Sequence, residues 1–395
     1  MDYGMSAELQ LFRAEVRAFV AENAPPIAPK AGVRTPESRE ELELFKKWTG
    51  ALFAAGYAGA GWPEEYGGRA GSHTLEHDIV VDEEIARARA PRGTGAGSLV
   101  ANALIDFGTA EQRAKYLPPM RTGDAIWCQL FSEPSSGSDL ASLRTRAVEQ
   151  EDGTFRVNGQ KVWTTNGHWA DHGYLLARTD PDAPKHKGIS AFIVDMTLPG
   201  IDVRPLREMT GTSDFNEVFL DDVVLPADSM IGGSGQGWLI ANSSLAQERT
   251  GVATSAVIQR QNVDALIELA RTTTRGGRPL IEDDRVIDEL GRLRAAVDAL
   301  SALVYANVSR WSHGRERVHD APMAKLMFSE LGVEISKFAL DLLGESGILA
   351  ERDADAADGG RWQDEFLYAR AYTIAGGTSE VMRNIIAERG LAMPR

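Results

Sequence analysis

The sequence is poor in cysteine, and Cys128 is the single one among 395 residues. One cysteine excludes a disulfide within the chain and a zinc site built from several cysteines, and it is typical of a reducing compartment. The chain starts without a basic segment followed by an apolar one, so we expect no secretory signal. No apolar run approaches the roughly 20 residues that span a bilayer. We therefore expect a cytoplasmic protein without a membrane span.

Positive charge is also scarce. The 42 Lys and Arg residues are outnumbered by 57 Asp and Glu residues, which gives a formal net charge of −15. Binding to nucleic acid requires a basic surface against the phosphate backbone, so this composition argues against a nucleic-acid-binding protein. Hydrophobic residues make up 43% and charged residues 25% of the chain, a composition typical of folded globular proteins. At roughly 150 residues per domain, the length predicts two to three domains.

Hydrophobic periodicity changes twice along the chain. The first part carries apolar residues at the 3.6-residue period of helices, a middle part is rich in short β-prone runs, and the last part returns to long helical patterns. This order predicts an α+β, mostly α fold with an N-terminal helical domain, a central β-barrel-like domain and a C-terminal four-helix bundle. We place these domains at residues 1–125, 126–232 and 233–395.

The patterns also predict individual elements. Helices are expected near residues 6–24, 40–55, 73–90, 110–120, 242–271, 285–313, 322–343 and 363–389. Asn158-Gly159 lies between two β-prone runs and predicts a hairpin turn. The glycine-rich segment 232–237 predicts a connection between domains. A phosphate-binding loop is disfavoured there, since the segment lacks the Gly-Lys-Ser/Thr ending of a P-loop.

Two histidine pairs and one serine cluster are weaker signals. His73 and His77, like His168 and His172, have the i,i+4 spacing that can present two ligands to a metal on a helix. Two ligands alone do not make a site, so we expect no metal. The serines of segment 135–139 lack a Gly-x-Ser-x-Gly elbow, which disfavours a hydrolase.

Three longer motifs carry more information. They read Phe-Ser-Glu-Pro-Ser-Ser-Gly-Ser-Asp at 131–139, Asn-Gly-Gln-Lys-Val-Trp-Thr-Thr-Asn-Gly at 158–167, and Ala-Gly-Gly-Thr-Ser-Glu-Val-Met-Arg-Asn at 375–384. In this order and at these separations they resemble the acyl-CoA dehydrogenase family over essentially the whole chain. The resemblance implies FAD in a cleft between the β-domain and the bundle, a neighbouring subunit that contributes to FAD binding, and assembly as a homotetramer or homodimer.

The resemblance also assigns roles to residues. Trp163 is expected to cover one face of the flavin ring and Thr165 to hydrogen-bond near flavin N5, while the alternative for Trp163 is a buried core position. Arg275 or Arg285 is left to supply positive charge to the FAD pyrophosphate, because the Phe and Gln of the family pattern are missing there. The expected FAD-binding residues are Phe131, Ser132, Trp163, Thr165, Arg275, Thr378, Ser379 and Glu380. The expected acyl-CoA-binding residues are Gly137, Ser138 and Arg249.

The family reaction is α,β-dehydrogenation of an acyl-CoA thioester, in which a carboxylate removes the α-proton and a hydride passes to flavin N5. In medium-chain enzymes this base is a glutamate of the C-terminal loop, but the matching residue here is Gly376. Glycine cannot accept a proton. The segment Leu-Ala-Gln-Glu-Arg at 245–249 is similar to the helix that carries the base in isovaleryl-CoA and long-chain enzymes, and it makes Glu248 the expected catalytic base.

Helical spacing supports Glu248 separately. Leu245, Val252 and Ala256 lie on one stripe of an expected helix, which continues to Val263 and Ile267. Glu248 follows Leu245 by three residues and precedes Val252 by four, so we expect it on the buried face. Burial raises the pKa of a carboxylate, as a base near neutral pH requires. A salt bridge of Glu248 within the bundle is the alternative.

Three functions are consistent with this sequence. The first is an FAD-dependent acyl-CoA dehydrogenase that passes electrons to an electron-transfer flavoprotein. Gly376 motivates the second, a non-catalytic FAD-binding subunit of a heteromeric acyl-CoA dehydrogenase. The third is an oxygen-using flavin oxidase on the same fold. The sequence does not define the acyl group, although a base on the bundle helix is compatible with branched, long or sterol-derived chains.

Overall fold

The computed structural model describes residues 5–32, 35–69, 72–91, 96–246, 250–351 and 353–394. The chain forms two compact units, each built from several segments. We call Met1–Arg34, Thr74–Pro91 and Arg249–Arg395 the bundle unit, and Thr35–His73 and Arg92–Glu248 the sheet unit. The helices of the first 125 residues are therefore shared between the two units.

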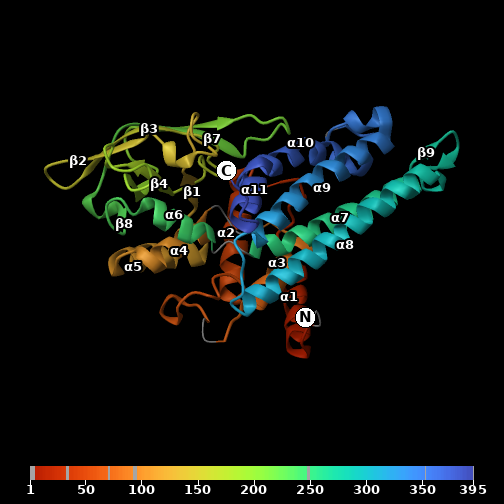
Figure 1. Cartoon of the computed structure of the whole chain (residues 1–395), viewed down its shortest axis with the longest axis horizontal. Helices are drawn as coiled ribbons and strands as arrows, with labels where there is room; N and C mark the ends of the chain where they lie inside the picture. Colours follow the sequence, from red (N-terminus) through yellow and green to blue (C-terminus); the bar gives the residue numbers. More distant parts are fainter. Residues whose placement is uncertain are drawn as a thin grey trace. The chain divides into compact units, whose positions relative to one another are not determined.

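The bundle unit is built on four helices that run side by side (Figure 1). They are α7 (Thr250–Thr272), α8 (Asp284–Ser312), α9 (Asp320–Leu343) and α10 (Arg361–Ile374). On α8 the apolar residues Leu293, Val297, Leu300 and Val304 alternate at spacings of four and three, which places them on one face. All four are buried, as are Val263 on α7 and Ala339 on α9. This interior is the four-helix bundle that the sequence predicts.

Two helices from the first part of the chain also belong to the bundle unit. They are α1 (Ala7–Asn23) and α3 (Leu75–Arg87), and the Ser6 hydroxyl caps α1 by accepting a hydrogen bond from Leu9 N at 3.2 Å. The guanidinium groups of Arg13 and Arg17 each contact the buried carboxylate of Glu84 at 2.8 Å. A buried carboxylate is stable only when it is paired, so these ion pairs hold α1 against α3.

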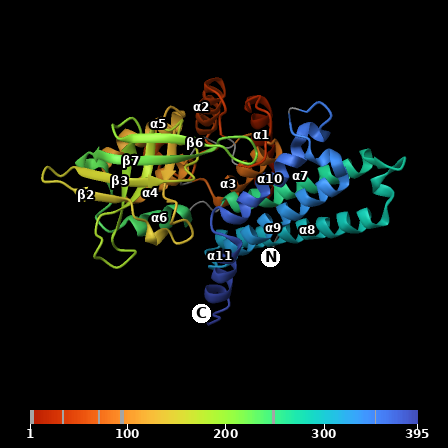
Figure 2. The ribbon, with the colours of Figure 1, turned by 90° about the horizontal axis from the view of Figure 1, so that it is seen from above.

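The sheet unit contains an eight-stranded mixed sheet, part of which is visible in Figure 2. Its strands are β1 (Trp127–Leu130), β2 (Arg146–Glu149), β3 (Phe155–Lys161), β4 (His172–Arg178), β5 (Ile189–Asp195), β6 (Ile201–Leu206), β7 (Phe215–Leu225) and β8 (Met230–Ile231). The order is β6-β7-β3-β2-β4-β5-β8, and β1 pairs with β4 in parallel. Four helices belong to the same unit: α2 (Arg39–Ala54), α4 (Gly97–Phe107), α5 (Ala110–Thr122) and α6 (Gly237–Ala246).

Strand β4 is buried on both faces and separates two apolar cores. Tyr174 and Leu176 point into a core shared with α4 and α6, whereas Leu175 and Ala177 point into a second core formed by the strands. Successive side chains of a strand point to opposite faces, so a run of apolar residues fits a strand that is covered on both sides. These cores hold the ends of β1 and β3 in place.

The hairpin predicted at Asn158-Gly159 is wrong. Both residues lie inside β3, where Asn158 is paired with Arg146 of β2. The neighbouring strand β7 carries a bulge at this point, and its Asp222 adopts a φ of +50°. The Asn158 side chain holds the bulge, since Nδ2 donates to Asp222 Oδ1 at 3.0 Å and Oδ1 accepts from Asp222 N at 2.9 Å. Asn158 and Gly159 therefore lie beside a β-bulge in the neighbouring strand and do not form a turn.

Two predicted helices are also corrected. The expected helix 363–389 is α10 followed by α11 (Ser379–Asn384) and a π-helical turn to Gly390, with Gly376 and Gly377 at positive φ between the helices. The expected helix 242–271 is α6 and α7, and residues 247–249 between them lie outside the described part. Helix α4 is not predicted from the sequence.

The glycine-rich segment 232–237 leads into α6 inside the sheet unit, where Gly235 N donates to Ser190 Oγ of β5 at 2.9 Å. No helix within the described residues is long and apolar enough to cross a membrane.

Candidate functional site

The first two sequence motifs lie against each other in the sheet unit. Val162 N, just after β3, donates to Ser132 O, just after β1, at 2.9 Å. Phe131 is buried and packs edge-on against Tyr174, with ring centroids 5.0 Å apart. Residues 140–157 separate segments 131–139 and 158–167 in the sequence, yet a backbone hydrogen bond joins the two segments directly.

A buried ion pair fixes this junction. Lys161 Nζ donates to Phe131 O at 3.0 Å and to Glu133 Oε1 at 2.9 Å, and the lysine side chain is fully buried. Glu133 also accepts from the backbone N–H groups of Arg144 at 2.7 Å and Thr145 at 2.9 Å. Burial lowers the pKa of Lys161 to about 8 although Glu133 opposes the shift. For Glu133, burial raises the pKa, but Lys161 and the N–H donors outweigh it and the net pKa is lowered.

Trp163 presents an exposed aromatic surface directly after this junction. Its φ is +59° and 60% of its surface is accessible, so the alternative of a buried core tryptophan is wrong. The following residue is anchored on both sides, because Thr164 N donates to Asn216 O at 3.1 Å and Asn216 Nδ2 donates to Thr164 O at 2.9 Å. Asn216 is fully buried. A rigid backbone in an unfavourable φ region therefore holds a large apolar ring in the open.

Polar groups beside Trp163 are left for a ligand. Thr164 Oγ1 and Asn166 Oδ1 are buried and have no hydrogen-bond partner among the residues that the structure describes. Thr165 between them is half-buried. A flat heteroaromatic ring with polar edges, such as a flavin, needs both an apolar surface and hydrogen-bonding groups. The residues of this segment fit that requirement.

The expected acyl-CoA contacts of this unit lie on a nearby loop. Glu133 and Ser136 pair with each other through their backbones, which turns the chain, and Gly137 and Ser138 follow in exposed positions. A Cβ atom added at Gly137 would meet no atom within 4 Å. The loop therefore leaves open space at the two residues predicted to contact the substrate.

The third motif lies in the bundle unit, between α10 and α11. Gly376 and Gly377 have φ values of +65° and +97°, and Lys325 Nζ donates to Gly377 O at 2.5 Å. Thr378 caps α11, since its Oγ1 accepts from Val381 N at 3.2 Å. Ser379 is buried, and its Oγ has no partner among the described residues. The loop thus combines two glycines at positive φ, which another side chain would strain, with a buried hydroxyl that has no partner among the described residues.

Glu380 and Arg275 are both exposed. Hydrogen bonds from its own backbone N–H and from the Thr378 hydroxyl lower the pKa of Glu380, which keeps it ionised. Arg275 lies in a two-stranded turn formed by β9 (Thr274–Arg275) and β10 (Arg278–Pro279). Its Nη2 donates to the carbonyl oxygens of Asp341 at 3.3 Å and Leu342 at 3.4 Å, so it caps the end of α9. Its predicted role toward FAD stays a prediction.

The predicted base, Glu248, and the predicted substrate residue Arg249 lie outside the described residues. The stripe invoked for Glu248 is corrected at one end, because Leu245 belongs to α6 and is 44% exposed. Ala256 and Val263 on α7 are buried as expected. The stripe therefore holds along α7 but does not extend as one buried face into α6.

Sequence reasoning missed the roles of Lys161, Glu133 and Asn216. The available signal is Lys161 itself, the second residue after Asn158-Gly159, because it lies on the face of the strand that carries the apolar residues Phe155 and Val157. The histidine pairs have ordinary roles: His77 Nδ1 accepts from Thr74 N at 3.2 Å at the start of α3, and His168 Nδ1 lies 3.0 Å from Asn216 Oδ1.

Comparison with known protein families divides the chain into three consecutive matched parts. Family models described as the N-terminal, middle and C-terminal domains of acyl-CoA dehydrogenase match residues 6–124, 128–223 and 235–391. Acyl-CoA dehydrogenase IpdE1 of Mycobacterium tuberculosis is 37% identical over 396 residues, and the alignment covers 98% of each chain.

Two solved structures show the same fold over the full length. The Tcur3481-Tcur3483 steroid ACAD is 30% identical with a TM-score of 0.87, and all of both chains is covered. The ChsE4-ChsE5 complex from Mycobacterium tuberculosis is 30% identical with a TM-score of 0.85 and the same coverage. Matches to three consecutive family models, a full-length relative above 30% identity and this fold lead to one conclusion: the chain belongs to the acyl-CoA dehydrogenase family, whose members are FAD-dependent oxidoreductases that act on acyl-CoA.

Proposed function

We propose that this protein is a catalytically active acyl-CoA dehydrogenase that forms a 2-enoyl-CoA with bound FAD and passes the electrons to an electron-transfer flavoprotein. The observation that carries the proposal is the junction of the first two motifs, with the exposed ring of Trp163 fixed beside it. The ring of Trp163 is mostly exposed beside a hydrogen-bonded backbone, and such a surface suits a flat cofactor.

Residues of this chain would contact three parts of FAD: the polar edge of the flavin, one face of its ring, and the dinucleotide. The backbone at Phe131 and Ser132 and the hydroxyl of Thr165 would bond the polar edge of the flavin, and Trp163 would cover one ring face. Thr378, Ser379 and Glu380 would contact the dinucleotide, with Arg275 near its pyrophosphate. FAD, when bound, supplies the acceptor for the hydride that leaves the β-carbon.

Glu248 is the proposed base that removes the α-proton. The support comes from the sequence, since position 376 of the C-terminal loop is glycine and the segment 245–249 matches the alternative base position. Gly137, Ser138 and Arg249 are the proposed contacts for the acyl-CoA. A hydrogen-bonded thioester carbonyl would make the α-proton more acidic, which lowers the demand on the carboxylate.

The test is Glu248→Gln in the holoenzyme. This variant should retain FAD, because the amide has the shape of the carboxylate, and its anaerobic flavin reduction by an acyl-CoA should slow by about 10²–10⁴-fold. Asp298→Asn, an exposed carboxylate of α8, serves as a control with unchanged reduction. Unchanged reduction in Glu248→Gln would remove Glu248 from the mechanism.

A second candidate is a subunit of a heteromeric enzyme that acts on a steroid-derived acyl-CoA. Gly376 supports it, and so do the two similar structures, whose names each join two proteins and one of which is called a steroid ACAD. If the chain purified alone is an apo-protein that takes up FAD only with a second chain, this candidate is favoured over a homotetramer or homodimer.

One further experiment identifies the acyl group of the substrate and the electron acceptor. A panel of straight, branched and steroid-derived acyl-CoAs is added to the oxidised enzyme without oxygen, and bleaching of the flavin band identifies the substrate. We expect the steroid-derived member to react fastest. Slow reoxidation in air and fast reoxidation by electron-transfer flavoprotein would support a dehydrogenase, whereas fast reoxidation in air would indicate an oxidase. We place the reaction in the cytoplasm, in line with the single cysteine.

A further inference from the structure

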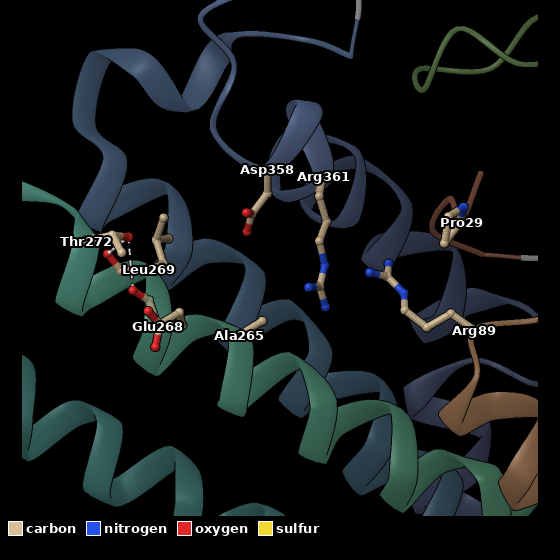
Figure 3. Close-up of a pocket in the computed structure, with 8 residues that line it drawn as sticks. All are labelled: Pro29, Arg89, Ala265, Glu268, Leu269, Thr272, Asp358 and Arg361. Atoms are coloured by element: carbon tan, nitrogen blue, oxygen red, sulfur yellow. Dashed lines mark hydrogen bonds between the residues drawn. The ribbon is translucent and has the colours of Figure 1, made fainter.

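The bundle unit contains a pocket of about 520 Å³ that none of the proposed flavin or substrate residues lines. Its walls come from α7, from the start of α10 and the turn before it, from Arg89 two residues after α3, and from Pro29. Figure 3 shows Arg89 and Arg361 on one side, with their guanidinium groups turned toward each other. Glu268 and Asp358 carry the negative charges of the wall, and Ala265 and Leu269 supply apolar surface.

The backbone of Arg89 has a positive φ angle, which is unusual for a residue with a side chain. It follows α3 in the left-handed region with a φ of +53°, where Ala90 N donates to Ile85 O at 3.1 Å and closes the helix. Helices commonly end this way on glycine, because a side chain at positive φ costs about 1 kcal/mol or more. The side chain of Arg89 makes no hydrogen bond or ion pair with any residue in the described part of the chain. The buried Glu365 of α10 attracts Arg89 electrostatically, but this attraction does not amount to an ion pair.

Arg361 faces Arg89 from the first turn of α10. Its Nη2 donates to Asn262 Oδ1 at 2.6 Å and its guanidinium carbon lies 4.8 Å from the ring centroid of Trp362, so the side chain is fixed. Its Nε is buried and has no partner among the described residues. Burial and then the charge of Arg89 lower the pKa of Arg361. The negative charges of Glu365 and Asp358 oppose this shift, but neither guanidinium forms an ion pair with a carboxylate among the described residues.

Two cations held close together and half-buried repel each other unless an anion lies between them. A guanidinium presents several N–H donors in a plane and binds carboxylate or phosphate oxygens in pairs. The N-terminus of α10 adds to the positive potential, because its cap is Gly360 and no side chain satisfies its first N–H groups.

We propose that this pocket is a binding site for a small organic anion, whose carboxylate or phosphate lies between Arg89 and Arg361. The opposite wall defines the rest of the ligand. Glu268 is exposed there, and one of its oxygens accepts from Arg271 Nη1 at 3.4 Å. Asp358 Oδ2 accepts from Trp362 Nε1 at 3.2 Å. These carboxylates suit hydroxyl or amino groups at the far end of the ligand, and the pocket is large enough for such a molecule rather than for a bare ion.

The experiment uses the FAD-loaded enzyme and isothermal titration calorimetry. Inorganic phosphate, glycerol 3-phosphate and succinate are the probes: the first two test a phosphate group with and without hydroxyl donors, and the third tests carboxylates. We expect saturable binding of one stoichiometric equivalent, with glycerol 3-phosphate tighter than inorganic phosphate if the far carboxylates take part. A phosphate source and a carboxylate source are distinguished by which probe binds more tightly.

Arg89→Gly is the decisive variant. Glycine relieves the positive φ, so the variant should melt at a higher temperature than the parent and still bind the probe at least about ten-fold more weakly, the loss expected for a charged hydrogen bond. Arg361→Gln should weaken binding by a similar factor, and Arg292→Gln, on the exposed surface of α8, should not change it.

Substitution of a neighbouring carboxylate, Glu365, should have the opposite effect on anion affinity. Glu365 lies one turn beyond Arg361 on α10 and is attracted by both arginines, although burial raises its pKa. Glu365→Gln removes a competitor for the two cations, so it should tighten anion binding. Flavin content is measured in every variant, which separates this site from the proposed FAD site. Absence of saturable binding by all three probes, or equal affinity in Arg89→Gly and the parent, would overturn the proposal.

Discussion

Lys161 and Glu133 form a buried ion pair, 2.9 Å long, that joins the ends of the two strands that lead into the first two motifs. The same ammonium group donates to Phe131 O, so one side chain fixes both the backbone and the carboxylate of the first motif. The pair is a positioning element, because it fixes the backbone positions next to Ser132 and Trp163. Its position in the interior makes it costly to disrupt.

Lys161→Met should destabilise the protein by about 3–5 kcal/mol, because the Glu133 carboxylate would remain buried without its partner. Flavin content should fall with it. Urea unfolding and the flavin absorbance of the purified protein measure both effects. Lys185→Met is the matched control, since its ion pair with Asp139 is half exposed and should be worth less than about 1 kcal/mol. The double variant Lys161→Met/Glu133→Gln should recover part of the loss; no recovery would contradict the buried-charge explanation.

Trp163→Ala should weaken FAD binding without weakening the fold. The ring is 60% exposed and both residues face the same cost at positive φ, so the apo-protein should unfold within about 1 kcal/mol of the parent. Loss of aromatic stacking should reduce FAD affinity by up to about ten-fold, which corresponds to 0.5–1.5 kcal/mol. Fluorescence titration of the apo-protein with FAD measures the affinity. Trp163→Phe should keep most of it, and equal FAD affinity in Trp163→Ala would show that the ring does not contact the cofactor.

Acid should weaken the bundle through Asp320. This carboxylate is 2% exposed and accepts from Arg310 Nη2 at 2.7 Å and Arg317 N at 2.9 Å. Burial raises its pKa, but these donors outweigh burial and the net pKa is lowered. Because the pKa is lower in the folded state, the ionised carboxylate stabilises the protein. This stabilisation is complete at a pH above the unfolded pKa of about 3.9, and it disappears as the pH falls through the folded pKa.

The comparison that tests this is parent against Asp320→Asn by urea unfolding between pH 7 and pH 3. The variant should be less stable by about 3 kcal/mol at pH 7, and the difference should shrink toward pH 3. Asp298→Asn, on an exposed ion pair of α8, should follow the parent. A difference that does not depend on pH would assign the role of Asp320 to packing.

Gly159→Ala should destabilise the sheet unit by about 1–3 kcal/mol. A Cβ at this position would lie 2.3 Å from Thr145 Oγ1 and 2.8 Å from Thr145 Cα, and the latter atom cannot move without the strand. Gly291→Ala is the control on α8, where nothing lies within 4 Å of the added atom and alanine should stabilise the helix by about 0.5–1 kcal/mol. Thermal melting separates the two, and a neutral Gly159→Ala would mean that β2 and β3 can shift apart.

Local patterns determined much of this fold because they record which face of an element is buried. The 3.6-residue period predicts α1, α2, α8 and α9 to within about two residues of their observed bounds, and the alternation of helical and β-rich parts predicts the architecture. The motifs predict the family, since their residue types and separations are specific together.

Local patterns failed where the partner of a residue is distant in sequence. Asn158-Gly159 has the composition of a hairpin turn, but its partners are a bulge in β7 and Thr145, the residue just before β2. The run 363–389 has helical periodicity, but Gly376 and Gly377 adopt positive φ there and the helix stops. The exposure of Trp163 and the pairing of Lys161 with Glu133 also depend on contacts between strands.

The amino-acid sequence by itself determined the class of fold, the family and the glycine at position 376, because these follow from residue type and order. Tertiary structure alone decided that Phe131, Lys161 and Trp163 share one rigid junction, and that Arg89 and Arg361 face each other across a pocket. Hydrogen bonds and charge repulsion act over a few ångströms in space, whatever the number of residues between the groups. That distance is set only when the chain has folded.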